Sequence, residues 1–302
     1  MTNTITLSDR DRALLRLLSW TPLTTTLLLR ASSTFPGDPF GNERRLRERL
    51  QTLAGVGFIR SWSTAHAGGG LQNYYKLTPA GFQTLLGRET PLPPKGFFAE
   101  ISPSLFEHTQ TLGEVIVATL RGCHEHRVTI LRFHRENDLP FAVGDRMVQP
   151  DCFFRFTTGG RNFSVAFEID LSTESVDGNS FQSVRRKLQT YDAYQSMVLS
   201  QWLQHGKTWE RPRFRVAFLT RTIDRAYHLL TVANQITENK NRRLVYAATL
   251  DAYLGSPDPV QSPLFVDHHG VWQSLVDPHP TAKSSRPAVR LPTNVQSSLP
   301  LG

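Results

Sequence analysis

The sequence predicts a two-domain α/β (α+β) protein, in which a small domain of three helices and a two-stranded wing precedes a larger domain with a mixed central sheet flanked by helices. Two patterns support this fold class: three amphipathic helical segments followed by two β-rich segments, and an α-β-β-β-α-β-α-β order after residue 97. A chain of 302 residues is long enough for two hydrophobic cores. We therefore predict domains at residues 1–91 and 98–277, joined by a Pro-containing linker at 92–97.

Helical spacing of leucines defines the first three segments. Ser8 is a suitable N-cap for a helix through Leu18, and Thr21-Pro22 starts a second helix. The third helix covers Asn42 to Leu53, and its leucines are spaced to share one face. This spacing leaves four basic side chains largely on the outer surface: Arg44, Arg45, Arg47 and Arg49.

Two β-rich segments follow this basic helix. They cover Gly57 to Trp62 and Asn73 to Thr78, on either side of a loop that contains Gly68-Gly69-Gly70. The whole order is typical of a winged helix-turn-helix, a domain that lays its basic helix in the major groove of DNA while the wing touches phosphate. Lys76 is a further candidate for DNA contact. The alternative is a winged helix that serves protein contact.

Positive charge is concentrated at the two ends of the chain. Residues 1–95 contain 12 Lys/Arg and 6 Asp/Glu. Residues 96–277 contain 19 Lys/Arg and 20 Asp/Glu, and residues 278–302 contain three Lys/Arg and no Asp/Glu. Basic segments bind phosphate with release of counterions. The charge distribution therefore favours double-stranded DNA as a partner, and the Pro- and Ser-rich tail at 278–302 is predicted to be disordered.

The sequence lacks the features of secreted and membrane proteins. Its start is polar and no apolar run approaches the roughly 18 residues of a membrane helix, so we expect a cytoplasmic protein. Cys123 and Cys152 are too few for a disulfide framework. We interpret His124-Glu125-His126 as a solvated helix end and His268-His269 as a surface turn.

The larger domain is predicted to begin with an amphipathic helix. In order, we expect a helix at residues 104–121, strands at 128–134, 147–156 and 162–170, a helix at 179–203, a strand at 213–220, a helix at 223–238 and a strand at 244–248.

Two neighbouring strands of this domain carry acidic side chains in a pattern that suits a divalent cation. Asp151 follows Pro150 on one strand, while Glu168 and Asp170 share a face of the next. The Gly159-Gly160 pair supplies a hairpin turn that aims the three carboxylates at one point. Mg²⁺ binds oxygen ligands and keeps several waters, which leaves room for a phosphate, so the pattern favours phosphodiester hydrolysis with Mg²⁺ or Mn²⁺. The alternative is that Asp151 closes a turn and the other two carboxylates line a solvated strand face.

These residues resemble the Pro-Asp, spacer, Glu-x-Lys signature of the PD-(D/E)XK nuclease superfamily, with Pro150-Asp151 and Glu168-Ile169-Asp170 at the matching positions. Asp170 stands where the superfamily has a lysine that positions the attacking water and stabilises charge on the phosphate. Some members carry a displaced lysine on the next helix, where this chain has Lys187. The resemblance implies Asp151, Glu168 and Asp170 as metal ligands and catalytic residues, with Lys187 as the replacing lysine. The alternative for Lys187 is a solvated helix face.

More narrowly, the chain resembles the bacterial replication-relaxation family from about Ser8 to Tyr253. The resemblance rests on four features: His108 with the helix expected at residues 112–120, the pair Pro150-Asp151, the motif at residues 167–174, and Lys187-Leu188 with Tyr191 and Tyr194. Members join a winged helix to a nuclease-like domain and occur on plasmids and other mobile elements.

This resemblance leaves two hypotheses open. One is a Mg²⁺-dependent endonuclease that the winged helix brings to DNA. The other is a nuclease-like scaffold without hydrolysis, in a DNA-binding replication, transfer or regulatory protein. Either form is expected to act with replication or transfer proteins of the same element, and as a homodimer where two cuts or a palindromic site require two protomers.

Overall fold

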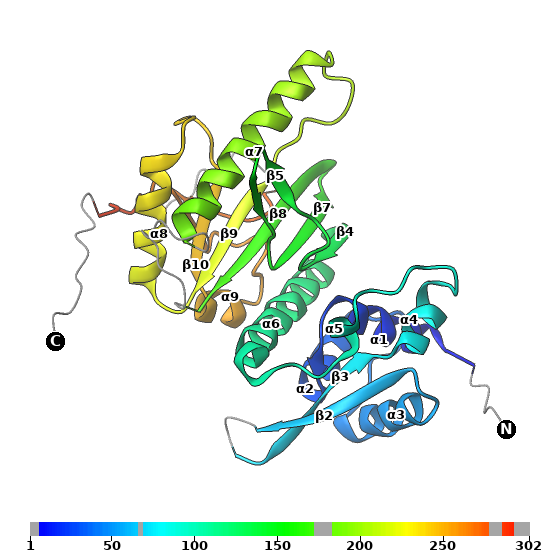
Figure 1. Cartoon of the computed structure of the whole chain (residues 1–302). Helices are drawn as coiled ribbons and strands as arrows, with labels where there is room; N and C mark the ends of the chain where they lie inside the picture. Colours follow the sequence, from blue (N-terminus) through cyan, green and yellow to red (C-terminus); the bar gives the residue numbers. More distant parts are fainter. Residues whose placement is uncertain (1–5, 66–68, 172–182, 278–285, 293–302) are drawn as a thin grey trace. The chain divides into compact units, whose positions relative to one another are not determined.

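The computed structural model describes residues 6–65, 69–171, 183–277 and 286–292 (Figure 1). The chain forms two compact units, Met1–Arg121 and Gly122–Gly302. The border lies within one helix, α6 (Pro103–Glu125), and the domain limits expected from the sequence stay predictions. Across the described residues, no helix combines the length and the apolar character that crossing a membrane requires.

The first unit has the predicted winged helix-turn-helix order. Its elements are α1 (Asp9–Trp20), β1 (Leu23–Thr24), α2 (Thr25–Ala31), a 3₁₀ turn (Ser32–Thr34), α3 (Glu43–Gly55), β2 (Ile59–Ala65), β3 (Leu71–Leu77), α4 (Pro79–Leu86) and α5 (Lys95–Phe98). Strands β2 and β3 form the antiparallel wing, and β1 pairs with the other edge of β3. Leu23 and Thr24 therefore belong to the sheet, whereas the sequence predicted that the second helix already covers them.

Capping side chains set the starts of these helices. The Ser8 hydroxyl accepts a hydrogen bond from the Asp11 amide at 3.2 Å, and the Asp11 carboxylate accepts one from the Ser8 amide at 2.8 Å, which forms a capping box. Thr24 and Asn42 cap α2 and α3 through their side-chain oxygens. The leucines of α3 are fully buried, as their spacing predicts, and Arg44, Arg45 and Arg47 of the same helix are exposed.

The second unit is built on a seven-stranded mixed sheet, which confirms the predicted fold class. Its elements after α6 are β4 (Thr129–Arg135), β5 (Phe141–Val143), β6 (Arg146–Val148), β7 (Cys152–Thr158), β8 (Arg161–Asp170), α7 (Val184–Gln204), β9 (Arg215–Thr220), α8 (Ile223–Ile236), β10 (Val245–Thr249), α9 (Leu250–Gly255), β11 (Phe265–Asp267) and β12 (Trp272–Gln273). The strand order is β12-β11-β10-β9-β8-β7-β4, with β8, β9 and β10 parallel and the other neighbours antiparallel. The single strand predicted at 147–156 is divided in the structure into the end of β6 and most of β7. The sequence does not predict β5, β11 and β12, because two or three residues are too few to show a period.

Helices α7 and α8 cover one face of this sheet (Figure 1). Ala166 of β8 belongs to the buried core that these helices form with the sheet. Strand alternation places Glu168 and Asp170 on the same face as Ala166. On the opposite face, the ring of Phe167 contacts that of Tyr253, with 5.9 Å between the ring centroids. The two acidic residues therefore face α7 and α8.

Part of the predicted disordered tail is bound to the second unit. The Val289 amide donates to the Gly270 carbonyl oxygen at 2.7 Å, and Val289 and Leu291 pack against the hydrophobic core. Apolar side chains among the Pro and Ser residues explain this docking, which composition alone does not reveal. Residues 278–285 and 293–302 lie outside the described part of the chain.

His268 is buried, and the prediction that it lies in a surface turn is wrong. Its side chain has no exposed surface, its amide donates to the Val245 carbonyl oxygen at 3.1 Å, and its carbonyl oxygen accepts from Asn234 at 2.5 Å. Burial, with the neighbouring His269, lowers the pKa of the His268 imidazole below its ordinary value. By contrast, His124-Glu125-His126 is exposed at the end of α6, as predicted.

Candidate functional site

Asp151 is held against the neighbouring strand at the start of β7. Its amide donates to the carbonyl oxygen of Phe167 at 3.0 Å, and its carboxylate oxygen Oδ2 accepts from the Ile169 amide at 2.6 Å. These contacts flank Glu168, and the charge of Asp151 acts on the Glu168 carboxyl group. The structure therefore brings together two of the carboxylates that the sequence singled out.

Lys187 and Tyr191 of α7 contact Glu168 directly. Lys187 Nζ lies 3.2 Å from Glu168 Oε2, and the Tyr191 hydroxyl donates to Glu168 Oε1 at 2.5 Å. Lys187 and Tyr191 are four residues apart on one helix and so project from the same side. A lysine from the next helix thus reaches the buried carboxylate, next to the strand position where Asp170 replaces the expected lysine.

Glu168 is almost completely buried, with 2% of its surface exposed. Burial raises the pKa of its carboxyl group to about 7; the Lys187 ammonium opposes this rise and the charge of Asp151 adds to it. Burial and the same carboxylate also raise the pKa of Tyr191 well above its ordinary value, so its hydroxyl remains a donor. Two acidic groups close together in a buried site are an arrangement that a bound cation would stabilise.

Asp170 shares the strand face with Glu168 but is paired elsewhere. Arg225 of α8 donates to both of its oxygens, with Nε–Oδ2 at 2.8 Å and Nη2–Oδ1 at 3.2 Å. Both residues are largely buried, so this fork-like pair connects the end of β8 to α8. No sequence pattern indicated Arg225 as its partner, because Arg225 is 55 residues further along the chain. The predicted metal role of Asp170 would require it to share its oxygens with this arginine.

The donor set fits a hard cation bound by two carboxylates. Within residues 6–65, 69–171, 183–277 and 286–292, no three His, Cys, Asp or Glu side chains are grouped as ready metal ligands. Mg²⁺ nevertheless commonly binds through one or two carboxylates and completes its shell with water and substrate phosphate. Asp151 and Glu168 supply such oxygens. The last residues of the family-like motif, Ser172-Thr173-Glu174, lie outside the described residues.

The outer face of α3 presents three of the predicted DNA-contacting arginines. Arg44 pairs with Glu48 at 3.0 Å and Arg47 with Glu43 at 2.7 Å, both across one helical turn at exposed positions. Arg45 is exposed between them. Exposed pairs of this kind contribute little stability, so phosphate can compete for the guanidinium groups at small cost.

Arg49 and Lys76 are not on this surface, which corrects two predicted positions. Arg49 donates to both oxygens of buried Asp11, at 2.6 Å and 2.5 Å. Burial alone would raise the pKa of Asp11, but the hydrogen bonds from Arg49 and Ser8 lower it below its ordinary value. Lys76 is only 7% exposed, and its Nζ donates to the Gly96 carbonyl oxygen at 3.3 Å and to a second carbonyl, that of residue 99, at 2.5 Å. Both cations stabilise the domain from within.

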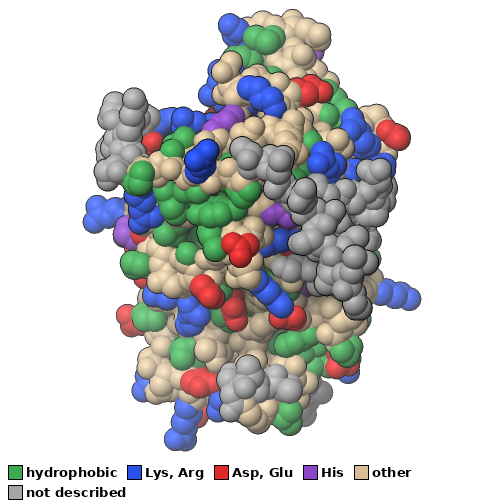
Figure 2. Space-filling model, turned by 90° about the vertical axis from the view of Figure 1, so that its left-hand side faces the viewer, with side chains coloured by type: hydrophobic (Ala, Val, Ile, Leu, Met, Phe, Trp, Pro, Cys, Tyr) green, Lys and Arg blue, Asp and Glu red, His purple; other side chains and the backbone are tan. Residues whose placement is uncertain are grey.

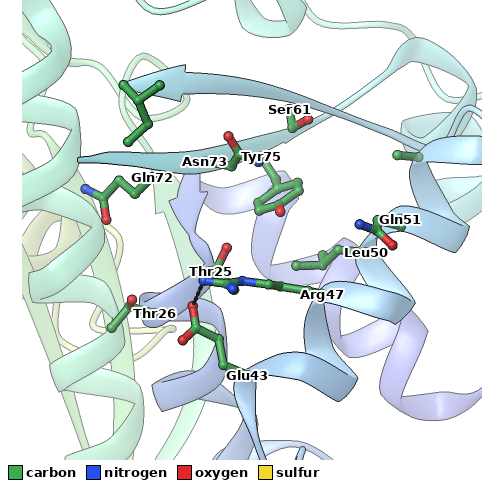
Figure 3. A pocket seen from close by; sticks show the side chains of 12 residues that line it. Thr25, Thr26, Glu43, Arg47, Leu50, Gln51, Ser61, Gln72, Asn73 and Tyr75 are labelled. Atoms are coloured by element: carbon green, nitrogen blue, oxygen red, sulfur yellow. Dashed lines mark hydrogen bonds and ion pairs between the residues drawn. The ribbon is translucent and has the colours of Figure 1, made fainter. Parts of the chain in front are cut away.

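A hollow of about 520 Å³ lies between α3 and the wing strands (Figure 3). Figure 3 shows Arg47 and Glu43 paired on one side and Asn73 and Tyr75 of β3 on the other. Gln51 of α3 also lines it. The sequence did not single out these amide and hydroxyl groups, because an uncharged polar residue on a strand carries no pattern of its own.

Comparison with other proteins gives a family and two structural similarities. No curated protein matches the chain. Among solved structures, Bacillus subtilis PadR in complex with operator DNA is similar, with 20% identity, a TM-score of 0.24 and coverage of 35% of this chain and 59% of PadR. The restriction endonuclease FokI is similar with 13% identity, a TM-score of 0.28 and coverage of 84% of this chain and 45% of FokI. The chain thus spans about half of each of these proteins. The sequence model of the replication-relaxation family matches residues 15–208, and the chain belongs to this family.

Proposed function

We propose that this protein binds double-stranded DNA through its winged helix and cuts or nicks DNA in a Mg²⁺- or Mn²⁺-dependent reaction at Asp151, Glu168 and Lys187. The observation that carries this proposal is the 3.2 Å contact between Lys187 Nζ and Glu168 Oε2, beside Asp151. Through this contact α7 supplies a lysine next to Asp151 and Glu168, whereas Asp170 occupies the usual lysine position on β8. Two carboxylates can hold the cation for metal-assisted phosphodiester hydrolysis, and a lysine beside them can stabilise the charge that develops on the phosphate.

Each residue has a defined task in this reaction. Asp151 and Glu168 would hold the cation, which when bound polarises the phosphate and makes water more acidic. The Lys187 ammonium donates a hydrogen bond to the attacking water and places positive charge where the phosphate becomes more negative. Tyr191 keeps Glu168 oriented through its hydroxyl. The attacking water gives up one proton to solvent as its oxygen bonds to phosphorus, one P–O ester bond breaks, and the leaving oxygen takes up a proton from solvent.

The winged helix supplies the affinity for DNA in this proposal. Arg44, Arg45 and Arg47 lie on the exposed face of α3, the helix that a helix-turn-helix domain places in the major groove. Gln51 and Asn73, in the hollow beside this face, are amides of the kind that read base edges. Membership of the replication-relaxation family supports a role on plasmids or other mobile elements, in the cytoplasm, with replication or transfer proteins and a second copy of the chain as partners.

A second candidate is a DNA-binding scaffold without hydrolysis. It is favoured by the occupation of the usual lysine position by Asp170, whose two oxygens are bound by Arg225. In this protein the Lys187–Glu168 pair would only stabilise the second unit.

Cleavage assays separate the two candidates. Supercoiled plasmid, linear duplex and single-stranded DNA are incubated with the full chain and Mg²⁺ or Mn²⁺, and compared with Asp151→Ala and Lys187→Ala. Lys240→Ala is the matched control, because Lys240 is an exposed lysine of the same unit that donates only to carbonyl oxygens at the end of α8. We expect cleavage by the wild type and the control and its loss in both site variants. If no substrate is cut while duplex binding is intact, the scaffold is the correct function.

A further inference from the structure

The C-terminal end of α7 and the segment that follows it carry aromatic and basic side chains that the proposed function does not use. We define the α7 platform as Trp202, Lys207, Trp209, Arg211 and Arg213. Figure 1 shows α7 extending past the sheet to this end, and at the top of Figure 2 hydrophobic and basic side chains adjoin there. Trp209 is 46% exposed, a large fraction for an indole ring.

The backbone around the α7 platform is well connected. The Trp202 indole N–H donates to the Trp209 carbonyl oxygen at 2.7 Å, and the Lys207 amide donates to the Trp202 carbonyl oxygen at 3.0 Å. Gln195 donates to the Pro212 carbonyl oxygen at 2.6 Å. These bonds fix the turn after α7, so Trp209 is presented on a defined loop and a ligand would not have to order it.

The charge of the α7 platform is positive and not compensated. Lys207 and Arg211 lie over the Trp202 ring, 5.8 Å and 5.6 Å from its centroid. Glu210 is bound instead by Arg155 of β7 and by Asn162 of β8, the latter at 3.1 Å. In the described part of the chain, no carboxylate lies within ion-pair distance of Lys207, Arg211 or Arg213. Three cations therefore remain for an anionic ligand.

We propose that the α7 platform binds unpaired DNA, with its cations on successive phosphates and the Trp209 ring stacked on a base. Grooves that combine cations with exposed aromatic rings bind single strands in this way, independently of sequence. Duplex DNA would use only the cations, because its bases are already stacked on one another. An acidic peptide would bind the cations through its carboxylates but would offer no base to stack on the Trp209 ring, so unpaired DNA fits the α7 platform better. The inference does not depend on hydrolysis, and it gives the nuclease-like unit its own contact with DNA.

Binding of a labelled oligothymidylate of about 16 nucleotides tests this proposal by fluorescence anisotropy, with the full chain in EDTA. Trp209→Ala should weaken binding roughly tenfold, since one stacked base is lost. Substitution leaves the Trp209 carbonyl, and with it the bond from Trp202, in place. Leu203→Ala is the control, because Leu203 is 57% exposed at the same end of α7 but carries neither charge nor ring. It should bind like the wild type.

Duplex binding, measured on the same samples, reports that the winged helix is intact, and thermal unfolding of each variant reports whether the second unit, which carries Trp209, is folded. The proposal is supported if Trp209→Ala loses affinity for the single strand and keeps that for the duplex. It is overturned if single-strand affinity is unchanged, if both affinities fall together, or if the α7 platform binds phosphatidylserine vesicles and not the oligonucleotide. Photo-crosslinking with 5-iodouracil gives a second criterion, since adducts should map to residues 202–213. The assay is run in EDTA and measures binding alone, so a failure of the cleavage proposal leaves this one testable.

Discussion

Lys187 of α7 places its ammonium group 3.2 Å from the buried carboxylate of Glu168 on β8, although the two residues are 19 positions apart in the sequence. Tyr191, one turn later on the same helix, holds the other carboxylate oxygen. The helix therefore supplies both partners of Glu168. This arrangement makes Lys187 the critical residue for deciding between a nuclease and a nuclease-like scaffold.

Replacing the Lys187 ammonium should remove most cleavage activity and leave DNA binding unchanged. Lys187→Met keeps the aliphatic stem but has no charge or donor, and loss of one such donor commonly reduces the turnover rate about 100-fold. Lys187→Arg should retain part of the rate because it restores the charge. Turnover at saturating plasmid measures the effect. Equal rates for wild type and Lys187→Met would show that this lysine has only a structural role.

Glu168 should make the fold less stable as the pH rises. Its pKa is raised from 4.5 to about 7 in the folded chain, mainly by burial. The folded state therefore holds this proton more tightly, and the associated stability is complete below pH 4.5 and lost as the pH rises through 7. The full effect is about 3 kcal/mol. Urea unfolding in EDTA should show that the stability of Glu168→Gln rises relative to that of the wild type between pH 4.5 and 7. If the unfolding free energies of the two proteins depended on pH in the same way, the prediction would be wrong.

Local sequence patterns predicted the elements around the site, and tertiary contacts decided its details. Alternation along β8 placed Glu168 and Asp170 on one face correctly. Helical spacing could also have paired Lys187 with Tyr191. It could not reveal that Arg225 binds Asp170, because that contact depends on how α8 packs on the sheet.

The same limit explains the errors elsewhere in the chain. Arg49 belongs to a row of arginines that spacing alone places on the surface, yet it is the partner of buried Asp11, 38 residues away. Lys76 and His268 are polar residues whose burial depends on distant carbonyl groups. Regular spacing of apolar residues predicted the buried faces of helices and strands. It did not predict where single polar side chains lie, because their partners are distant in sequence.

Gly81 should be indispensable to the winged helix. A Cβ atom at this position of α4 would lie 1.9 Å from the Phe58 carbonyl oxygen, so the helix would have to move away from the wing. Gly81→Ala should therefore destabilise the first unit by about 2 kcal/mol or more, although alanine normally favours a helix. Gly55→Ala, at the end of α3 with nothing within 4 Å, is the control and should be neutral or stabilising. Thermal unfolding measures both. A Gly81→Ala protein as stable as the control would contradict the close approach.

Arg45 and Arg49 lie four residues apart on α3, yet their substitution should have opposite consequences. Arg45 is exposed, so Arg45→Ala should preserve stability while weakening duplex binding and reducing the slope of log affinity against log salt by about 1. Arg49→Ala leaves the Asp11 carboxylate, 1% exposed, without its guanidinium partner and should cost about 3 kcal/mol of unfolding free energy. Filter binding at several salt concentrations and urea unfolding separate the two effects. If Arg49→Ala changed the salt slope at unchanged stability, its guanidinium would have to contact phosphate, and the internal role assigned to it here would be wrong.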